Sequence, residues 1–501
     1  MKNFVIINNL SFAYPNAAEP LFDQVSVQCQ SGWTGIVGPN GGGKTTLLKL
    51  IKGDLKPDHG DIRTPGLVLY AEQRMHDMPH ALPDFLISFE KYAIRIKDQL
   101  QIHGDWSERW ESLSFGERKR CQIAVALAKD PDVLLLDEPS NHLDHSSKQI
   151  LIGALEDFRG VGLLVSHDRD LLDTLCSHTL FVEPPKIDLR ACAYSLAAQE
   201  REREQESLRH EREVRKKAVK KLKRRAQQQR QKAEAADKQR SKRGIAAKDH
   251  DAKTKIDLAR FTGKDGVHGR LYERTKARLQ RAEEQQQAIR VKKKFDLGIS
   301  YAESGNSYKF PIVISATTLQ MGEAFLQVPE LSLNAGEKIG LIGDNGSGKS
   351  TFVRFLTNLL PFQADQLIYI PQEIPAESIG RIVQRIHNLS DANKGDIMTI
   401  IRRLGSEPTR VLETSLPSPG EVRKLLLAEG IQKNPALIIM DEPTNHMDLP
   451  SIRCLEEALS ECGCALLLVS HDFVFLQQVV SYYWTFERNN LISKIVPRYS
   501  I

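Results

Sequence analysis

The same short motifs occur twice in this chain of 501 residues, with almost the same spacing each time. A glycine-rich segment begins at Gly38 and again at Gly343, 305 positions later. Four further landmarks recur 299 to 304 positions apart: Gln73 and Gln372; Ser114-Phe115-Gly116-Glu117 and Ser418-Pro419-Gly420-Glu421; Asp137-Glu138 and Asp441-Glu442; His167 and His471. A repeat of this length predicts two copies of one domain, so a fold inferred for the first copy must also suit the second copy.

Each copy has the pattern of an α/β domain built on a mainly parallel sheet. Residues 133–136 and 437–440 are continuous apolar runs that end at a carboxylate, as expected of a strand buried on both faces. The pattern returns at 162–166 and 465–470, directly before each repeated histidine. Polar residues therefore follow the C-terminal ends of strands, where parallel sheets place their binding sites. Further strands are expected at 4–10, 25–28, 34–37 and 339–342, and helices at 45–51 and 351–359.

The glycine-rich segments fit the pattern GxxxxGK[S/T] and predict phosphate-binding loops. Between a buried strand and a helix, the backbone N–H groups of such a loop point at phosphates beside the positive end of the helix. We expect Lys44 and Lys349 to neutralise the β- and γ-phosphates, and Thr45 and Ser350 to bind Mg²⁺. The first loop consists of Gly38, Pro39, Asn40, Gly41, Gly42, Gly43, Lys44 and Thr45, and the second of Gly343, Asp344, Asn345, Gly346, Ser347, Gly348, Lys349 and Ser350.

Adjacent carboxylates follow the long apolar run in each copy. We expect Asp137 and Asp441 to support the bound Mg²⁺, and Glu138 and Glu442 to polarise the water that attacks the γ-phosphate. A pair of solvated turn residues at a strand end is the plainer alternative. The recurrence of the pair at the same distance from both loops favours the catalytic role.

Histidine and glutamine complete the predicted sites. His167 and His471 each stand in a Val-Ser-His-Asp segment, and this repetition favours a γ-phosphate contact over the structural role of a lone histidine. Gln73 and Gln372 each end a shorter apolar run. Only their repetition marks these glutamines as site residues.

A strongly basic stretch separates the two copies. Residues 196–300 contain 32 Lys and Arg against 16 Asp and Glu, a net charge of +16, whereas the whole chain carries only +5. A segment so charged and so poor in aromatic residues cannot bury a core of its own. Residues 196–240 lack Gly and Pro and are rich in Ala, Gln, Glu, Lys and Arg, which predicts a helix about 65 Å long.

The rest of the basic stretch predicts a return of the chain. Glycines within 241–269 indicate a tip or break, and residues 270–294 a second helix. An antiparallel hairpin is expected, with a disordered polar linker as the alternative. Its inward-facing residues are predicted to be Leu208, Ala218, Leu222, Ala226 and Ala233 on the first helix and Leu271, Leu279, Ala282 and Ile289 on the second.

Several motifs together resemble the ATP-binding-cassette (ABC) superfamily of P-loop NTPases, and specifically its ABC-F class. They are the Ser-x-Gly-Glu segments at Ser114 and Ser418 and the Asp-Glu-Pro-[Ser/Thr]-Asn-His-x-Asp runs at 137–144 and 441–448. That class has two cassettes in one chain, no membrane domain and a charged helical linker. The resemblance implies an α/β fold of two tandem ABC ATPase domains, at 1–195 and 301–501, joined by a long basic α-helical hairpin at 196–300.

The resemblance also implies that the cassettes of one monomer close head to tail around two ATP molecules, forming an intramolecular cassette dimer. Site one would combine residues 38–45, Thr46, Gln73, Asp137, Glu138 and His167 with Ser418, Gly420 and Glu421; site two would combine residues 343–350, Thr351, Gln372, Asp441, Glu442 and His471 with Ser114, Gly116 and Glu117. Tyr14 lies where the family has an adenine-stacking aromatic residue. The Mg²⁺ ligands would come from Thr45, Gln73 and Asp137 and from Ser350, Gln372 and Asp441.

The sequence departs from the family pattern in three places. Phe115 stands where glycine is usual, Pro417 replaces a leading leucine, and no clear second aromatic residue matches Tyr14. These differences allow the two sites to hydrolyse ATP at unequal rates. Ser114 follows Gln73 by only 41 positions, too few for the long arm that some family members insert there.

By resemblance, this ATPase binds the ribosome when it carries ATP and inserts its linker near the tRNA and the peptidyl-transferase region. A rod of this charge gains affinity for rRNA by counterion release, and its scarcity of aromatic residues favours backbone and shape contacts over base stacking. The long linker and missing arm resemble the branch that protects ribosomes from antibiotics. Alternatives are a general translation factor that relieves stalled or idle ribosomes, a DNA-associated repair ATPase and an exporter ATPase subunit.

Two further expectations concern the location of the protein. No run of about 18 uncharged apolar residues is present, and the N-terminus lacks the features of a signal peptide. The seven cysteines are expected to be buried or free thiols, because one isolated CxC is a poor metal site. A cytoplasmic protein in a reducing compartment fits these observations.

Overall fold

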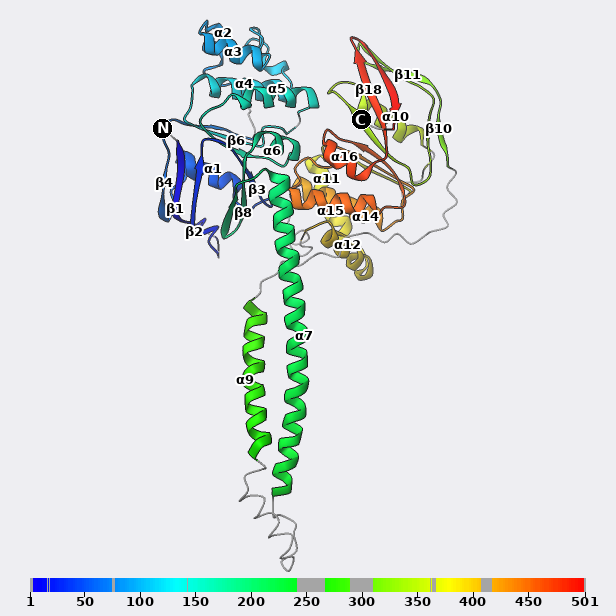
Figure 1. The fold of residues 1–501 in the computed structure, drawn as a ribbon. Coiled ribbons are helices and arrows are strands. Elements are labelled where there is room, and N and C mark those ends of the chain that lie inside the picture. The colour runs from blue at the N-terminus through cyan, green and yellow to red at the C-terminus, as the bar shows by residue number, and fades with distance from the viewer. Residues whose placement is uncertain are drawn as a thin grey trace, which may run out of the picture. The chain divides into compact units, whose positions relative to one another are not determined.

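The computed structural model describes residues 3–15, 17, 19–73, 77–141, 143–240, 266–288, 310–360, 362, 366–406 and 417–499. The chain forms two compact units: Met1–Ala197 together with Phe295–Ile501, and Ala198–Lys294. The first unit contains both copies of the repeat, and the second contains most of the basic stretch (Figure 1).

The first copy contains a three-stranded and a six-stranded sheet. Its strands are β1 Phe4–Phe12, β2 Phe22–Gln30, β3 Gly32–Val37, β4 His59–Arg63, β5 Val68–Ala71, β6 Val133–Asp137, β7 Val161–Val165, β8 His178–Glu183 and β9 Lys186–Arg190. The small sheet has the antiparallel order β2-β1-β4. The large sheet has the order β5-β6-β7-β3-β8-β9 and is parallel apart from its last pair.

Helices connect these strands in the α/β manner. They are α1 Lys44–Lys52, α2 Leu82–Ile87, α3 Lys91–Gln99, α4 Phe115–Ala128, α5 His145–Glu156 and α6 Arg169–Leu175, with a short 3-10 turn at Trp110–Ser112. The predicted strand at 133–136 lies within β6, and all four of its residues are fully buried. This burial on both faces explains why the run is continuously apolar.

The second copy repeats the central topology. Its strands are β10 Ile312–Ile314, β11 Thr317–Met321, β12 Ala324–Val328, β13 Leu331–Leu333, β14 Lys338–Gly343, β15 Leu367–Ile370, β16 Leu437–Asp441, β17 Ala465–Val469, β18 Tyr482–Asn489 and β19 Ile492–Arg498. They form a sheet of order β11-β12-β19-β18-β14-β17-β16-β15 and a two-stranded β10-β13 pair. The run β15-β16-β17-β14-β18-β19 matches the six-stranded sheet of the first copy strand for strand, as the duplication predicts.

The helices of the second copy follow the same order as those of the first. They are α10 Lys349–Leu359, α11 Ala376–His387, α12 Asp391–Arg403, α14 Pro419–Ile431, α15 Leu449–Ser460 and α16 Phe473–Val479. Strand register places the site residues of each copy at one edge of its sheet. Asp137 pairs with Val165 and Asp441 with Val469, so each carboxylate lies beside the segment that carries the repeated histidine.

Residues 198–294 contain two helices in contact. The long helix α7 spans Tyr194–Arg240 and α9 spans Gly266–Ala288 (Figure 1). Lys223 Nζ lies 2.8 Å from Glu283 Oε1, and Arg215 Nη1 donates to the carbonyl of Gln285 at 3.4 Å. The predicted helical hairpin is therefore present, whereas residues 241–265 lie outside the described residues.

Two details of the hairpin prediction are wrong. Val219 is 6% exposed while Ala218 is exposed, and Leu271 is 39% exposed. The buried Val219 and Ala226 and the half-buried Leu222 are separated by steps of three and four residues, which is the 3.5-residue period of two packed helices, and Ala218 is out of phase with it. The side chains of Ala233 and Ile289 are outside the described residues.

The second helix also begins earlier than predicted. Residues 266–269 were expected to belong to the break, but α9 starts at Gly266. A glycine within a helix costs only about 1 kcal/mol relative to alanine. Glycines in the first turn therefore do not prevent a helix whose later residues favour it.

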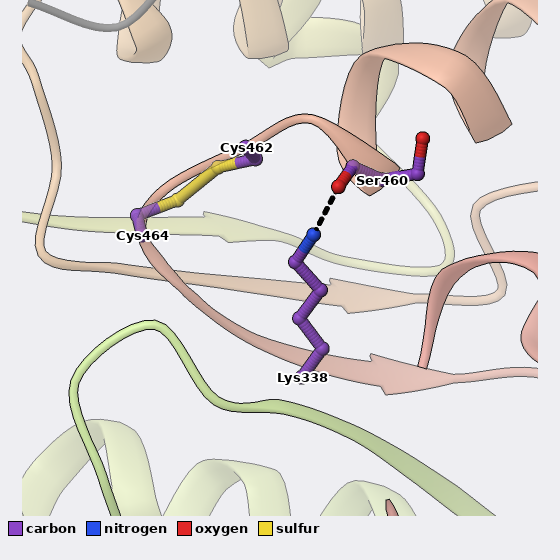
Figure 2. The surroundings of a disulfide bond; sticks show 4 residues. All are labelled: Lys338, Ser460, Cys462 and Cys464. Carbon is purple, nitrogen blue, oxygen red and sulfur yellow. Dashed lines mark hydrogen bonds between the residues drawn. A yellow bond between two sulfur atoms is a disulfide. The ribbon is translucent and has the colours of Figure 1, made fainter. Parts of the chain in front are cut away.

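The structure also corrects the expectation for two cysteines. Cys462 and Cys464 form a disulfide across Gly463, in the turn between α15 and β17 (Figure 2). Their Cα atoms are 5.6 Å apart, within the range that a disulfide spans. Lys338 lies beside this turn, and its Nζ donates to the Ser460 carbonyl (Figure 2). The other five cysteines are free thiols, as expected.

Within the described ranges, no helix is both long and apolar enough to cross a bilayer.

Candidate nucleotide-binding sites

Both glycine-rich loops end in a glycine that the backbone requires. Gly43 precedes α1 with φ 88°, and Gly348 precedes α10 with φ 102°. Side chains disfavour this left-handed region, whereas glycine adopts it readily. Each following lysine folds back over its own loop. Lys44 Nζ donates to the carbonyls of Gly38 and Pro39 at 2.9 and 3.1 Å, and Lys349 Nζ donates to those of Gly343 and Asp344 at 2.6 and 2.9 Å.

The two loop lysines are buried cations. Lys44 is 8% exposed and Lys349 is 7% exposed. Burial lowers the pKa of both ammonium groups, because removal from water disfavours the charged form, while Glu138 and Glu442 respectively oppose this shift. A bound phosphate would stabilise these charges further. The loops therefore fit a polyphosphate group.

The loop hydroxyls lie against the predicted magnesium carboxylates. Thr45 Oγ1 donates to Asp137 Oδ2 at 2.8 Å, and Ser350 Oγ donates to Asp441 Oδ2 at 3.2 Å. Burial raises the pKa of Asp441. Hydroxyl and carboxylate oxygens are the ligands that Mg²⁺ prefers, so both pairs fit this ion. Tyr70 OH also donates to Asp137 Oδ2, at 3.1 Å, a contact that the sequence did not reveal.

Each predicted catalytic glutamate is held beside its histidine. Glu138 Oε2 accepts a hydrogen bond from the His167 backbone N–H at 3.3 Å, and Glu138 Oε1 lies 3.2 Å from His167 Nε2. Glu442 and His471 repeat the arrangement at 3.3 and 3.5 Å. Within the described structure, Oε1 of both glutamates is buried without a hydrogen-bond partner of good geometry. Such an oxygen is able to accept a proton from a water molecule.

Burial sets the protonation of these pairs. It raises the pKa of Glu138 and of Glu442 to about 8. It lowers the pKa of His167 and of His471 to about 3, with the nearby loop lysines contributing in the same direction. The imidazoles are therefore neutral at physiological pH, and each keeps one N–H donor and one acceptor nitrogen.

The loop of each copy contacts the Asn-His-x-Asp segment of the other copy. The Asn40 backbone N–H donates to Asp448 Oδ2, and Asn40 Nδ2 donates to the His446 carbonyl, both at 2.9 Å. In the reciprocal contact, the Asn345 backbone N–H donates to Asp144 Oδ2 at 3.1 Å. The two aspartates also cap the start of α5 and α15 in their own copies. This crossed pairing is the head-to-tail arrangement that the resemblance implies.

A cavity of about 510 Å³ lies at site two and is shared by the two copies. The second copy contributes Met321, Asn345, Gly346, Gly348, Lys349, Ser350, Thr351, Gln372, Asp441, Glu442, Asn445 and His471, and the first contributes Ser114, Phe115 and Gly116. Most residues predicted for site two therefore line one space. In site one, the structure brings Lys44, Thr45, Asp137, Glu138 and His167 together, while the approach of Gln73, Ser418 and Gly420 stays a prediction.

Glu117 and Glu421 each contact the start of their own helix. The Glu117 carboxylate accepts hydrogen bonds from the Ser114 backbone N–H and Oγ, both at 2.8 Å, and Glu421 does the same with Ser418. Each glutamate completes a capping box at the start of α4 or α14. Their carboxylates thus order the helix starts, and Glu117 is not among the residues that line the cavity of site two.

The residues on the side of each loop where the resemblance places adenine differ between the two sites. Tyr14 is 46% exposed, and its hydroxyl lies 2.9 Å from Thr46 Oγ1, close to the first loop. At site two the cavity is lined instead by Met321, at the end of β11. Tyr14 likewise follows the end of β1, so matching the strand ends, without requiring an aromatic residue, would have revealed Met321.

Comparison with known proteins places these features in a family. The family described as "ABC transporter" matches residues 22–141 and again 326–445. The chain is 29% identical over 509 residues to the ribosome protection protein VmlR of Bacillus subtilis (strain 168), covering 96% of this chain and 86% of VmlR. It is 27% identical over 528 residues to the tylosin resistance ATP-binding protein TlrC of Streptomyces fradiae, covering 90% and 92%.

A solved structure shows the same fold. The crystal structure of the archaeal ribosome recycling factor aABCE1, in complex with the ribosomal stalk protein aP1, has a TM-score of 0.61 to this chain with 18% sequence identity. The similarity covers 98% of this chain and 90% of that one.

Proposed function

This chain belongs to the ABC-F class of ATP-binding-cassette ATPases, and from this premise we propose that it binds the ribosome while two ATP molecules hold its cassettes together. The two copies of the repeat are the cassettes, at 1–195 and 301–501, and residues 196–300 are the linker. Hydrolysis opens the cassettes and releases the protein into the cytoplasm. ATP thereby shifts a two-state equilibrium between closed and open forms.

The crossed loop contacts carry the proposal that ATP closes the cassettes. Asn345 of the second loop meets Asp144 of the first cassette, and Asn40 of the first loop meets Asp448 of the second. The cavity at site two is lined by both cassettes, so an ATP molecule bound there touches Ser114 and Lys349 together. Nucleotide binding is then favoured in the closed form. Only such differential affinity enables a ligand to drive closure.

Each site divides the chemistry among its own residues. Lys44 and Lys349 would hold the phosphates, and the Thr45–Asp137 and Ser350–Asp441 pairs would hold Mg²⁺ together with Gln73 and Gln372. Mg²⁺, when bound, neutralises charge that develops on the β- and γ-phosphate oxygens.

Glu138 and Glu442 prepare the water for attack on the γ-phosphate. In its ionised form, which the charge of the nearby loop lysine favours, each glutamate orients the water through Oε1 and takes up its proton. The neutral imidazoles of His167 and His471 offer an N–H to the γ-phosphate. Glu117 and Glu421 contribute by fixing Ser114 and Ser418 at the helix starts that face the nucleotide.

The ribosome is the proposed partner for two reasons. VmlR and TlrC are named for ribosome protection and tylosin resistance, and both align with more than 85% of their own length. The linker carries a net charge of +16, which suits a polyanion such as rRNA or tRNA. We propose that the linker enters the region of the tRNA and the peptidyl-transferase centre and protects the ribosome from an antibiotic. A general translation factor for stalled or idle ribosomes is the second candidate.

Trapping of the closed state tests the proposal. Changing both catalytic glutamates, Glu138→Gln and Glu442→Gln, should preserve ATP binding and stop hydrolysis. The double variant should then co-sediment with ribosomes in ATP, whereas the unchanged protein should be released. Normal release of the double variant would contradict the mechanism. Expression of the unchanged protein in a susceptible strain, against a panel of ribosome-targeting drugs, separates the two candidate functions.

A further inference from the structure

Lys119 is a buried cation that lies outside the residues assigned to ATP. It is on α4, five positions after Ser114, and is 2% exposed. Its Nζ donates to the backbone carbonyl of Glu72 at 2.5 Å. Glu72 directly precedes Gln73, in the loop after β5. The start of α4 lines the cavity of site two, but the loop that Lys119 holds belongs to site one.

Arg423 occupies the equivalent position in the second cassette, 304 residues later, and is 3% exposed. It lies five positions after Ser418 on α14. Its Nη1 donates to the carbonyls of Glu442 and Asn445 at 3.1 and 2.5 Å, and its Nη2 donates to the carbonyl of Gln372. These three acceptors belong to residues that line site two. The start of α14, in contrast, is assigned to site one.

Stability alone does not account for a cation at these positions. Burial lowers the pKa of Lys119 to about 8 and lowers the pKa of Arg423, so holding either charge in the interior is unfavourable. An apolar side chain of similar length avoids that cost. What an apolar side chain cannot do is fix the direction of a backbone carbonyl. A positioning role therefore explains the charged residues better than a packing role.

We propose that Lys119 and Arg423 are positioning residues that couple the two ATP sites. Each joins the helix that presents Ser-x-Gly-Glu to one site with the glutamine loop that serves the other site. Closure of site one on α14 thus sets the geometry of Gln372 and Glu442 in site two through Arg423. The inference rests on the two-site assignment of the proposed function, but not on any binding to the ribosome.

The coupling is unequal in the two directions. The planar guanidinium of Arg423 donates hydrogen bonds to three backbone carbonyls, whereas the ammonium of Lys119 donates to one. Arg423 therefore fixes the backbone of site two more strongly than Lys119 fixes that of site one. A second asymmetry is that Tyr14 lies beside the first loop, whereas Met321 lines the cavity of site two.

A double-mutant cycle on the full chain tests the coupling. Glu138→Gln is made first, so that site two is the only site that hydrolyses ATP. In this background, Arg423→Met should lower kcat about tenfold through misplacement of the catalytic loop, with KM changed less than about twofold. Ser418→Ala, which weakens closure of site one, should also lower kcat at site two. The two changes together should have no more effect than Arg423→Met alone, because both break the same path.

Controls separate positioning from folding. Arg402→Met removes an exposed cation from α12 of the same cassette and should leave kcat and the unfolding temperature unchanged. Arg423→Lys keeps the charge but reaches fewer of the three carbonyls. Its kcat should therefore lie between that of the protein with Arg423 and that of the Arg423→Met variant. The proposal is wrong if Ser418→Ala and Arg423→Met act additively, or if kcat falls only in parallel with the unfolding temperature.

The same experiment distinguishes failure of the coupling from failure of the site assignment. Glu138→Gln and Glu442→Gln should each lower the ATPase activity of the unchanged protein by removing one site. If neither change lowers it, the two-site assignment is wrong and the coupling fails with it. If both lower it and the cycle is additive, the coupling alone is wrong.

Discussion

At the scale of single residues, Lys119 makes a prediction about stability and pH. Its pKa is about 8 in the folded chain, against an ordinary value of 10.5. Between these pH values the unfolded chain holds a proton that the folded chain has released, so stability rises with pH across this window. Lys119→Met removes the effect. At pH 7 the variant should be as stable as the unchanged protein or more stable, by up to about 3 kcal/mol.

The check is the free energy of unfolding by denaturant, measured from pH 7 to pH 10 for both proteins. The free energy of unfolding of the unchanged protein should increase relative to that of the variant as the pH rises. Parallel curves would show that Lys119 titrates normally, and a variant much less stable at pH 7 would show that the side chain serves packing.

A contact between two site residues is predictable from the sequence where recognisable motifs locate both of them. Thr45 and Asp137 meet because the loop after β3 and the C-terminal end of β6 lie at the same edge of one parallel sheet, and the sequence shows both. The contact of Glu117 with the nucleotide stays a prediction, whereas its capping box with Ser114 follows from the local Ser-x-x-Glu motif. Lys119 was missed because its partner is a backbone carbonyl 47 residues away, which leaves no mark on the sequence.

At the scale of elements, the linker hairpin should depend on its buried stripe. Val219 is 6% exposed and Val214 is 52% exposed, although both are valines on α7. Val219→Gln should destabilise the pairing of α7 with α9 by about 2 kcal/mol, because a buried apolar side chain is lost. Val214→Gln should change little.

Hydrogen exchange of the full chain measures this effect directly. Amides of α7 and α9 should exchange faster in the Val219 variant, with those of the two cassettes unchanged. Equal exchange in the two variants would mean that the helices do not support each other. Composition alone predicted the existence of these helices, but the choice of Val219 over Ala218 required the 3.5-residue period that packing imposes.

At the scale of the whole molecule, a buried ion pair between described residues joins the two cassettes. Arg169 Nη2 of the first cassette lies 2.8 Å from Glu456 Oε1 of the second, and both side chains are about 90% buried. Glu456→Gln leaves the arginine charge buried without its partner, which costs about 3–5 kcal/mol. The variant should need more ATP for half-maximal hydrolysis, because closure becomes less favourable.

The exposed neighbour Glu457 provides the matched control, since Glu457→Gln removes the same charge from the outer face of α15. Equal ATP requirements in the two variants would show that the ion pair does not support closure. The sequence could not predict this pair. Arg169 and Glu456 do not occupy equivalent positions in the repeat, so only the assembled cassettes bring them together.

The charge of the linker gives the last prediction at this scale. Lys220, Lys221 and Arg224 are exposed on α7, within the stretch of net charge +16. If they contact rRNA phosphates, changing all three to Gln should weaken ribosome binding and reduce its dependence on salt. Each lost contact reduces the steepness of the plot of log K against log salt concentration by about 0.7–0.9. The slope of the triple variant should therefore be smaller in magnitude by roughly 2.

A matched variant of the first cassette separates this effect from that of net charge. It changes three exposed lysines to Gln and so removes the same charge: Lys91, Lys129 and Lys186. Ribosome binding is measured by co-sedimentation in ATP across a salt series, with the Glu138→Gln and Glu442→Gln changes present in every protein to prevent release. Because counterions are released only where phosphates are contacted, the two variants should differ in slope even though their net charges are equal. Identical slopes would mean that the linker is held away from the rRNA, and the cassettes would then have to supply the binding surface.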